Sequence, residues 1–233
     1  MTLRPVGILG GMGPEATILL QRKLVAAVPA TDDQDHIPLL IDMNPQVPSR
    51  VRHLLDGVGE DPGPTLAAMA RRLEDAGALA LAMPCNTAHH YAKAITDSVD
   101  IPLLNLIELA AEYAARTLGS GGCIGMLASP AVQRTYLFET TLQTRGLSVV
   151  WPADDEKMLA AIRKIKTDGP CNEGRETLRV ASKELVAAGA DLQLVACSEF
   201  SLIADSVAAE VNAIDTIDLL VQAIVEFSHA GQV

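Results

Sequence analysis

The chain has 233 residues, of which 49% are hydrophobic and only 3% aromatic, so aliphatic side chains must supply most of its core. This length and composition exclude a disordered chain and allow either one large domain or two small ones. A formal net charge of −11 disfavours nucleic acid as a partner, and any anionic substrate would need a local cationic pocket.

Short apolar runs alternate along the chain with longer amphipathic stretches. The apolar runs predict strands at residues 6–11, 38–44, 78–84, 101–106, 122–128, 147–153 and 191–197. Apolar residues at helical spacing predict helices at residues 14–28, 63–77, 87–99, 106–119, 129–146, 155–166, 173–188 and 217–231. This alternation is typical of parallel sheets covered by helices, so the predicted fold class is α/β.

The sequence also contains an internal repeat. Residues 69–87 (MARRLEDAGALALAMPCNT) align with residues 181–199 (ASKELVAAGADLQLVACSE) at an offset of 112. Residues 6–16 resemble residues 123–133, with a strand, a tight turn and a helix in the same order. The repeat predicts two pseudo-symmetric, Rossmann-like halves, each a parallel sheet flanked by helices.

The repeat superimposes Cys85 on Cys197, and each follows a predicted strand. Ligands bind at the carboxyl ends of the strands in open α/β sheets. We therefore predict a domain of residues 1–106 and 210–233 that carries Cys85, a domain of residues 107–209 that carries Cys197, and an active site in the cleft between them.

Two facing cysteines fit one kind of reaction. Inverting a carbon that bears an acidic hydrogen requires a base on one face and an acid on the other, and a thiolate and a thiol can exchange these roles. The predicted helices that follow Cys85 and Cys197 favour thiolate formation through their dipoles. A buried cysteine can also be a small hydrophobic core residue. Cys123 and Cys171 have no symmetric counterpart and are predicted to be structural.

The setting predicted from the sequence is cytoplasmic and reducing. No secretory signal precedes the first strand, and the four cysteines form no CxxC pair of the zinc or redox type. No apolar run approaches the roughly 20 residues that a membrane helix requires. We therefore expect a protein without disulfides, metal or membrane partner.

Several stretches of the sequence occur together in one known family. They are GILGGMGPEAT (7–17), DDQDHIPLLIDMNPQVPSR (32–50), GEDPGPTLAAMARRLEDAGA (59–78), AMPCNTAHH (82–90) and ACSEFSL (196–202). On these motifs the chain resembles the aspartate/glutamate racemase family of cofactor-independent amino-acid racemases. The resemblance implies racemisation of a small acidic amino acid, aspartate before glutamate, by two thiols without pyridoxal phosphate or metal, often in a homodimer.

The resemblance also implies roles for individual residues. Cys85 and Cys197 match the two catalytic cysteines. The residues that match substrate-binding positions are Met12, Arg50, Asn86, Thr87, Ser129, Lys166, Ser198 and Glu199. Glu199 is placed either to activate Cys197 or to cap its helix. His89 and His90 are adjacent on a predicted helix, so at most one of them can face a ligand.

The cations among these residues have a physical rationale of their own. A guanidinium such as Arg50 can bind a carboxylate bidentately, and Arg50 and Lys166 can stabilise the charge that grows as Cα loses its proton. Without the resemblance, both would be read as solvated surface charges.

The segment after the second cysteine departs from the family pattern. The family commonly reads GCTE followed by Ile-Pro-Leu, and Ser129 stands where threonine is common. This chain has instead Ala196, Ser198, Phe200 and Ser201. Serine keeps the hydroxyl for carboxylate binding, whereas Phe200 and the missing proline are expected to reshape the pocket near Cys197.

The sequence is also compatible with three other functions. Residues 11–16 (GMGPEA) fit a G-x-G-x-x-A dinucleotide fingerprint, with Asp32 and Asp33 near the position of a ribose-binding acid. Against this, Pro14 removes an N–H from the helix start and Glu15 would repel a pyrophosphate. The second is a related isomerase or decarboxylase on the same scaffold, of the one-cysteine or hydantoin type. The third is a module that binds aspartate without converting it.

Overall fold

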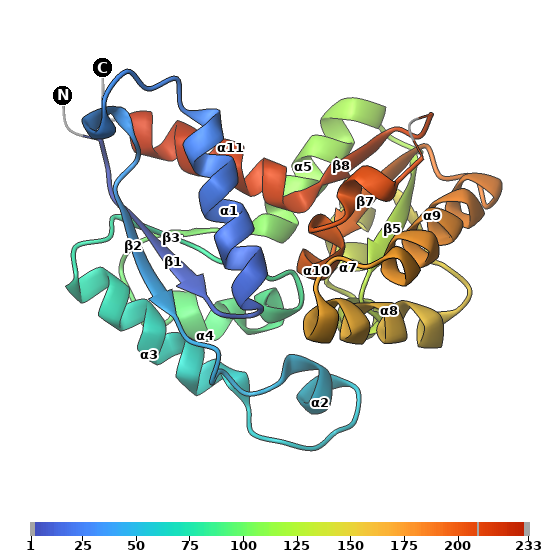
Figure 1. The fold of residues 1–233 in the computed structure, drawn as a ribbon, viewed down its shortest axis with the longest axis horizontal. Coiled ribbons are helices and arrows are strands. Elements are labelled where there is room, and N and C mark those ends of the chain that lie inside the picture. The colour runs from blue at the N-terminus through green and yellow to red at the C-terminus, as the bar shows by residue number, and fades with distance from the viewer. Residues whose placement is uncertain (1–2, 209, 231–233) are drawn as a thin grey trace. The chain divides into compact units, whose positions relative to one another are not determined.

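The computed structural model describes residues 3–208 and 210–230, in two compact units (Figure 1). Unit 1 comprises Met1–Leu106 and Ile217–Val233, and unit 2 comprises Ile107–Thr216. Each unit contains a four-stranded parallel sheet with helices around it, which confirms the predicted α/β class. The predicted domain ranges also include residues 1–2, 209 and 231–233, and the last predicted helix includes residue 231; these lie outside the described residues.

Unit 1 is built on the sheet β2-β1-β3-β4, in which every neighbouring pair is parallel. Its strands are β1 (Val6–Gly10), β2 (Leu39–Met43), β3 (Ala80–Ala82) and β4 (Leu103–Leu104). Its helices are α1 (Pro14–Ala27), η1 (Asp33–Asp35), α2 (Arg50–Leu54), α3 (Pro62–Asp75), η2 (Thr87–Tyr91), α4 (Ala92–Thr96) and most of α11 (Thr216–His229). The two ends of this unit are joined, since Arg4 N–H donates to Ser228 O at 3.1 Å.

Unit 2 repeats this plan with the sheet β6-β5-β7-β8, again parallel throughout. Its strands are β5 (Cys123–Ala128), β6 (Ser148–Val150), β7 (Leu192–Ala196) and β8 (Ala213–Asp215). Its helices are most of α5 (Leu106–Leu118), α6 (Pro130–Thr135), α7 (Leu137–Gln143), α8 (Asp155–Asp168), α9 (Asn172–Ala187), α10 (Ser198–Ser201) and η3 (Ala204–Ser206).

The internal repeat of the sequence is a repeat of packing. A Cβ on Gly7 in β1 would lie 2.9–3.1 Å from side-chain atoms of Leu81, Ala78 and Leu73. A Cβ on Gly125 in β5 would lie 2.9–3.2 Å from side-chain atoms at the aligned positions, which are Ala190, Leu185 and Gln193. Glycine is therefore needed at both sites, because the long helix of each half packs directly on the first strand.

The helices that precede the two cysteines end in the same way. Gly77 after α3 and Gly189 after α9 both have positive φ, of 99° and 89°. The following N–H groups, of Ala78 and Ala190, donate to carbonyls five residues earlier, each at 3.0 Å. This glycine turn ends each helix at the same distance from its cysteine.

Two of the predicted helices are interrupted. The stretch predicted as one helix at 129–146 forms α6 and α7, because Tyr136 between them adopts the left-handed conformation with φ 54°. The stretch at 87–99 begins as the 3-10 helix η2 before it becomes α4. Both breaks depend on the conformation of a single turn, to which hydrophobic periodicity is insensitive.

Several short elements had no sequence prediction. The strand β8 pairs with β7 along Ala213–Asp215, so unit 2 extends to Thr216 and the chain returns to unit 1 at Ile217 rather than at residue 210. Helix α2 spans five residues and is capped by Ser49, whose Oγ accepts the Arg52 N–H at 3.3 Å. Such elements are too short to show a period.

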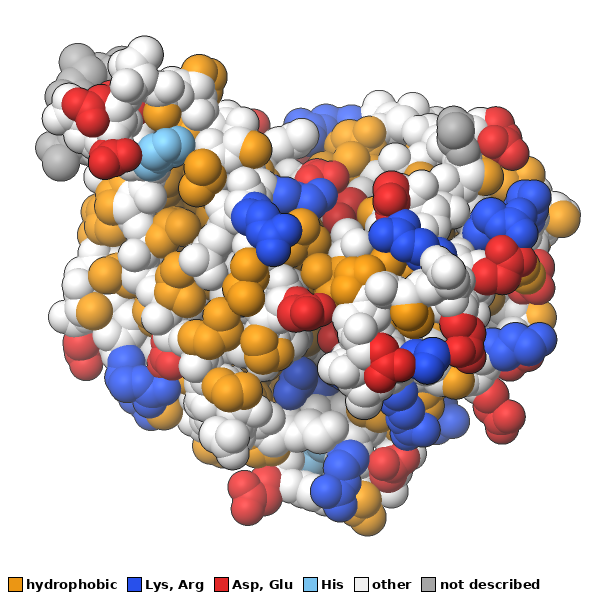
Figure 2. Space-filling model, viewed as in Figure 1, with side chains coloured by type: hydrophobic (Ala, Val, Ile, Leu, Met, Phe, Trp, Pro, Cys, Tyr) orange, Lys and Arg blue, Asp and Glu red, His pale blue; other side chains and the backbone are white. Residues whose placement is uncertain are grey.

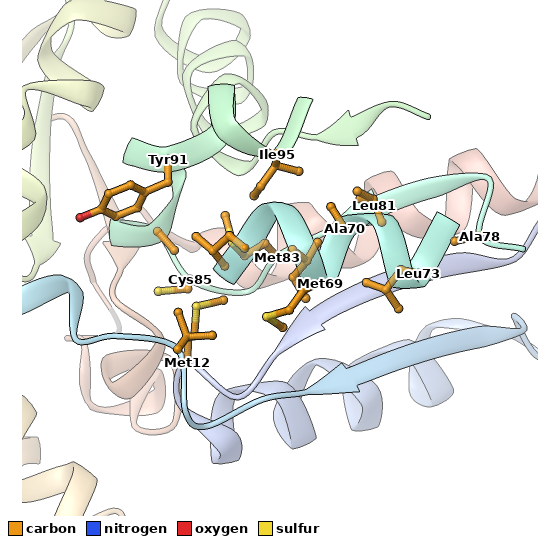
Figure 3. Packing of buried hydrophobic residues seen from close by; sticks show 14 residues of the cluster. Met12, Met69, Ala70, Leu73, Ala78, Leu81, Met83, Cys85, Tyr91 and Ile95 are labelled. Carbon is orange, nitrogen blue, oxygen red and sulfur yellow. The ribbon is translucent and has the colours of Figure 1, made fainter. Parts of the chain in front are cut away.

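Each unit has an apolar core of its own. In unit 1, side chains of α3, β3 and the segment after β3 form a buried cluster that includes Leu66, Met69, Leu81, Met83 and Cys85 (Figure 3). In unit 2, α8, α9 and β7 form the corresponding cluster, which includes Cys197 and Phe200. Each candidate cysteine thus belongs to the core of its own unit.

The surface carries charges of both signs. Basic and acidic side chains lie interspersed over the helices of unit 2 (Figure 2), where Lys164 pairs with Asp168 on α8 and Arg179 with Glu176 on α9. Within the described ranges, no helix has the length and apolar character that crossing a membrane would take.

Candidate active site

The two cysteines occupy equivalent places at the carboxyl ends of their sheets. Cys85 lies three residues beyond the end of β3, and Cys197 follows β7 directly. Strand β3 runs parallel to β1 and strand β7 runs parallel to β5, with Ala82 opposite Ile8 and Ala196 opposite Ala128. The loops after β1 and β5 therefore reach the same sheet edge as the cysteine of their unit.

Cys85 is 6% exposed and sits in the apolar cluster of unit 1. Its N–H donates to Met83 O at 2.8 Å, which turns the chain sharply after the strand. Figure 3 shows the Cys85 side chain next to Met12, at one end of the cluster. The thiol is thus held by packing, and its polar neighbours come from the residues that follow it.

His89 holds the backbone of the Cys85 segment. Its Nδ1 lies 2.9 Å from Cys85 O, and its Nε2 accepts the Leu106 N–H at 3.1 Å, so Nδ1 carries the proton and donates. Burial lowers the pKa of His89 to about 4, which keeps the ring neutral. The sequence predicted that at most one of the two adjacent histidines faces a ligand. His90 is exposed, whereas His89 is buried and connects the cysteine segment to the start of α5.

The polar candidates of unit 1 come from two places, the residues directly after Cys85 and the start of α2. Asn86 is buried and Thr87 half-buried, directly after Cys85. Arg50 opens α2, where its Nη1 donates to Val47 O at 3.4 Å and to Pro48 O at 3.2 Å. Its Nε is buried and finds no hydrogen-bond partner among the residues that the structure describes.

Met12 follows β1 in a loop whose shape is set by Gly11. Gly11 has φ 92°, and a Cβ there would overlap the backbone of Asn44, so no other residue fits. Its N–H donates to Thr17 Oγ1 at 3.0 Å. Met12 itself is 3% exposed and packs in the cluster with Cys85, so its observed contacts are apolar.

Cys197 is surrounded by charged and polar groups of unit 2. Its Sγ donates to Glu199 Oε2 at 3.2 Å, and Ser198 Oγ donates to the same oxygen at 3.3 Å. Lys166, from α8, places Nζ 3.3 Å from Glu199 Oε1. Four candidate residues of this unit therefore form one connected group.

The environment of Cys197 makes it a thiol. Burial raises its pKa well above the usual value, and the Glu199 carboxylate raises it further. The expectation of a helix-stabilised thiolate is wrong for this residue, because α10 has only four residues and the nearby negative charge opposes ionisation. Cys197 is therefore placed to donate a proton.

The unusual residues after Cys197 have definite places. Phe200 is fully buried in the core cluster of unit 2. Ser201 Oγ lies 2.7 Å from Asp215 Oδ1 and 3.2 Å from Cys197 O, so it ties the cysteine backbone to the end of β8. Ser201, at the position where the family commonly has proline, thus supports the loop by hydrogen bonding.

Ser129 and the two remaining cysteines complete the set. Ser129 Oγ accepts the Ala131 N–H at 3.0 Å and caps α6, which leaves its own hydroxyl hydrogen available to a ligand. Cys123 opens β5 and Cys171 precedes α9, both half-buried; all four cysteines of the chain are free thiols. No three His, Cys, Asp or Glu side chains of residues 3–208 and 210–230 are grouped to hold a metal ion.

The profile of the Asp/Glu/hydantoin racemase family matches residues 9–224. The chain belongs to this family. It is therefore an isomerase of the racemase type, as the motifs around Cys85 and Cys197 predicted. Asp32, considered as a ribose-binding acid, instead caps the short helix η1 through the Asp33 N–H at 2.7 Å.

The relatives are racemases whose names give different substrates. The aspartate racemase of Picrophilus torridus matches with a TM-score of 0.85 and 26% identity, over 97% of this chain and 94% of that one. The broad specificity amino-acid racemase RacX of Bacillus subtilis is 24% identical over 97% of this chain and 99% of its own. The glutamate racemase of Francisella tularensis, at 15% identity and a TM-score of 0.69, shares the fold over 100% of this chain and 83% of that one.

Proposed function

We propose that this protein interconverts L- and D-aspartate, with Cys85 and Cys197 as the acid–base pair. The observation that carries the proposal is the equivalence of the two thiols: each follows the third strand of its sheet, in halves that repeat at an offset of 112 residues. The similarity to an aspartate racemase over nearly the whole chain supports aspartate as the substrate. Glutamate is the second acidic candidate.

The reaction needs one thiolate and one thiol. In one direction the Cys85 thiolate takes the proton from Cα, so that the C–H bond breaks, an S–H bond forms and the electron pair delocalises into the α-carboxylate. Cys197 then gives its proton to the opposite face of Cα and becomes the thiolate. The reverse direction starts from that state, so neither enantiomer is privileged.

In this mechanism Glu199 keeps Cys197 protonated, so that Cys197 acts as the acid. Its carboxylate accepts the S–H at 3.2 Å and so keeps the proton on sulfur until a carbanion on the substrate accepts it. When Cys197 is the thiolate, Lys166, 3.3 Å from Glu199, reduces the repulsion between the two negative groups. The proposed active form requires the two thiols to reach opposite faces of one carbon.

The cationic residues give the substrate its place in a strongly acidic protein. Arg50 has a buried Nε with no hydrogen-bond partner in the described part of the chain, and it can bind a carboxylate through two parallel hydrogen bonds. Amide and hydroxyl donors at the carboxyl ends of the two sheets come from Asn86, Thr87 and Ser129. Ser198 Oγ, which donates to Glu199 here, would have to turn to the substrate to take part.

Incubation with L-aspartate in D₂O, without added cofactor, tests the proposal. A racemase incorporates deuterium at Cα and abolishes the optical rotation, whereas a decarboxylase releases carbon dioxide and a binding module does neither. Cys85→Ser and Cys197→Ser are each expected to abolish racemisation, while the matched control Cys123→Ser keeps it. Racemisation that survives in the Cys197→Ser variant would exclude the two-thiol mechanism.

We further infer that the enzyme acts without pyridoxal phosphate or metal, as a cytoplasmic homodimer. Four free thiols fit a reducing compartment, and thiol chemistry supplies both proton-transfer groups. Sedimentation equilibrium measures the oligomeric state. Activity that disappears after extensive dialysis against a chelator would contradict the metal-independent mechanism.

A further inference from the structure

Besides Arg50 Nε, the unit that carries Cys85 contains another buried donor without a hydrogen-bond partner among the described residues. Tyr91, at the end of η2, is 7% exposed, and its hydroxyl makes no hydrogen bond to any residue within the described ranges. Burying a hydroxyl away from water without a new hydrogen bond lowers the stability of the folded state by about 1–3 kcal/mol. Such a group is explained most simply by a ligand that completes it.

The hydroxyl of Tyr91 points out of the core. The ring belongs to the apolar cluster of Cys85, and Figure 3 shows its oxygen directed away from the side chains of Met69, Leu73 and Ile95. Two histidine rings pack edge-on against it, with centroids 6.0 Å away for His53 and 5.0 Å for His90. These contacts hold the ring and leave the oxygen free to bind.

The same contacts bring Tyr91 to the helix of Arg50. His53, which touches the ring, lies three residues after Arg50 on α2, so both side chains lie on the same side of that short helix. The charge of Arg50 lowers the pKa of Tyr91, although burial and the Asp61 carboxylate outweigh it and raise that pKa to about 12. The phenol is therefore protonated and available as a donor at neutral pH.

We propose that the Tyr91 hydroxyl and the Arg50 guanidinium together bind one carboxylate of the substrate. Each has a buried donor that the described protein leaves unpaired, and a carboxylate has enough lone pairs to accept from both. This inference rests on the proposed function, because it assigns a group to the same substrate. Asp61 works against an anion here; its Oδ1 accepts the Gly63 N–H at 2.8 Å, and at the Tyr91 hydroxyl the charge of Arg50 acts in the opposite direction to that of Asp61.

The substitution Tyr91→Phe removes the oxygen and keeps the ring with its packing. The dissociation constant of L-aspartate is measured by calorimetry in the Cys197→Ser background, where turnover is stopped, with and without Tyr91→Phe. We expect binding to weaken by about tenfold or more, as for a lost hydrogen bond to a charged group. The melting temperature should stay equal or rise, because an unpaired buried hydroxyl has been removed. Tyr136→Phe, at a tyrosine that is 65% exposed, serves as the matched control and should change neither quantity.

The possible results separate the two proposals. A change in binding of less than about twofold, or weaker binding together with a lower melting temperature, overturns the role of Tyr91. Binding that depends on Tyr91 without racemisation in the unsubstituted protein overturns the proposed function and keeps the carboxylate site. Absence of any aspartate binding to the unsubstituted protein overturns both.

Discussion

Replacing Glu199 by glutamine is expected to lower the pKa of the Cys197 thiol. The carboxylate oxygen lies 3.2 Å from the sulfur, and at an effective dielectric constant of about 20 two unit charges at that distance repel by about 5 kcal/mol. Lys166, which is paired with Glu199, cancels part of the repulsion, so the decrease in the pKa of Cys197 should be smaller than this energy alone would give.

The thiolate absorbance of a single-cysteine protein measures this pKa. Cys85, Cys123 and Cys171 are replaced by serine, and the ultraviolet absorbance of the remaining Cys197 is followed as the pH rises. The Glu199→Gln protein should ionise at lower pH than its parent. In the protein with all four cysteines, the same substitution should lower kcat in the direction in which Cys197 is the acid, because the thiol loses the group that keeps it protonated.

A matched substitution distinguishes charge from structure. Glu184 is exposed on α9, and Glu184→Gln should leave the titration of Cys197 unchanged. Ionisation of Cys197 at an unchanged or higher pH in the Glu199→Gln protein would refute the electrostatic role of Glu199. Circular dichroism spectra of parent and variant establish whether the fold is retained.

Four further substitutions test the contacts that hold the two cysteine-bearing halves. The pKa of His89 is 6.5 in the unfolded chain and about 4 in the folded protein, so the folded state is stabilised above pH ~6.5 and loses this stability as the pH falls towards ~4. The loss in the free energy of unfolding, measured with urea, should be about 3 kcal/mol. His89→Gln should lessen this pH dependence, and an unchanged pH dependence would contradict the role of the ring. Ser201→Ala should destabilise unit 2 by about 1–2 kcal/mol and lower kcat more than it raises KM, whereas unaltered kinetics would limit Ser201 to a structural role. Gly7→Ala and Gly125→Ala should each cost about 1–3 kcal/mol in denaturant unfolding, and a variant as stable as its parent would show that its helix can move off the strand.

Much of the fold follows from local pattern. The seven predicted strands all overlap observed ones, because strands of a parallel sheet covered by helices are short runs rich in apolar residues. The strand β8 was missed since three residues between polar neighbours carry no pattern, and only pairing with β7 makes them a strand. The break at Tyr136 was missed for a related reason: a single left-handed residue ends α6 without any glycine to signal it.

The site was less predictable than the fold. The repeat and the motifs made Cys85 and Cys197 the candidate catalytic residues, which stays a prediction, and the proximity of Glu199 to Cys197 in the sequence made their contact one of the two options considered. His89 was missed because its second partner, the Leu106 N–H, lies 17 residues away and meets it only in the folded chain. Tyr91 carries a signal only in the structure, where its hydroxyl is buried without a hydrogen-bond partner among the described residues, unlike that of an ordinary core aromatic.

The two halves hold the backbone of their cysteines alike but place different side chains two residues after them. His89 and Ser201 are aligned by the same offset of 112 residues that aligns Cys85 with Cys197, and each bonds the carbonyl of its cysteine. Each also reaches the end of the fourth strand of its sheet, through the Leu106 N–H after β4 and through Asp215 in β8. The position of Glu199, however, is occupied by Thr87 in the first half, so only Cys197 has a carboxylate as its aligned neighbour. The carbonyls of the two cysteines are therefore held in the same way, whereas Glu199 lies beside the sulfur of Cys197. Under the proposed two-thiol mechanism, this carboxylate would make Cys197 the residue that starts the cycle with a proton.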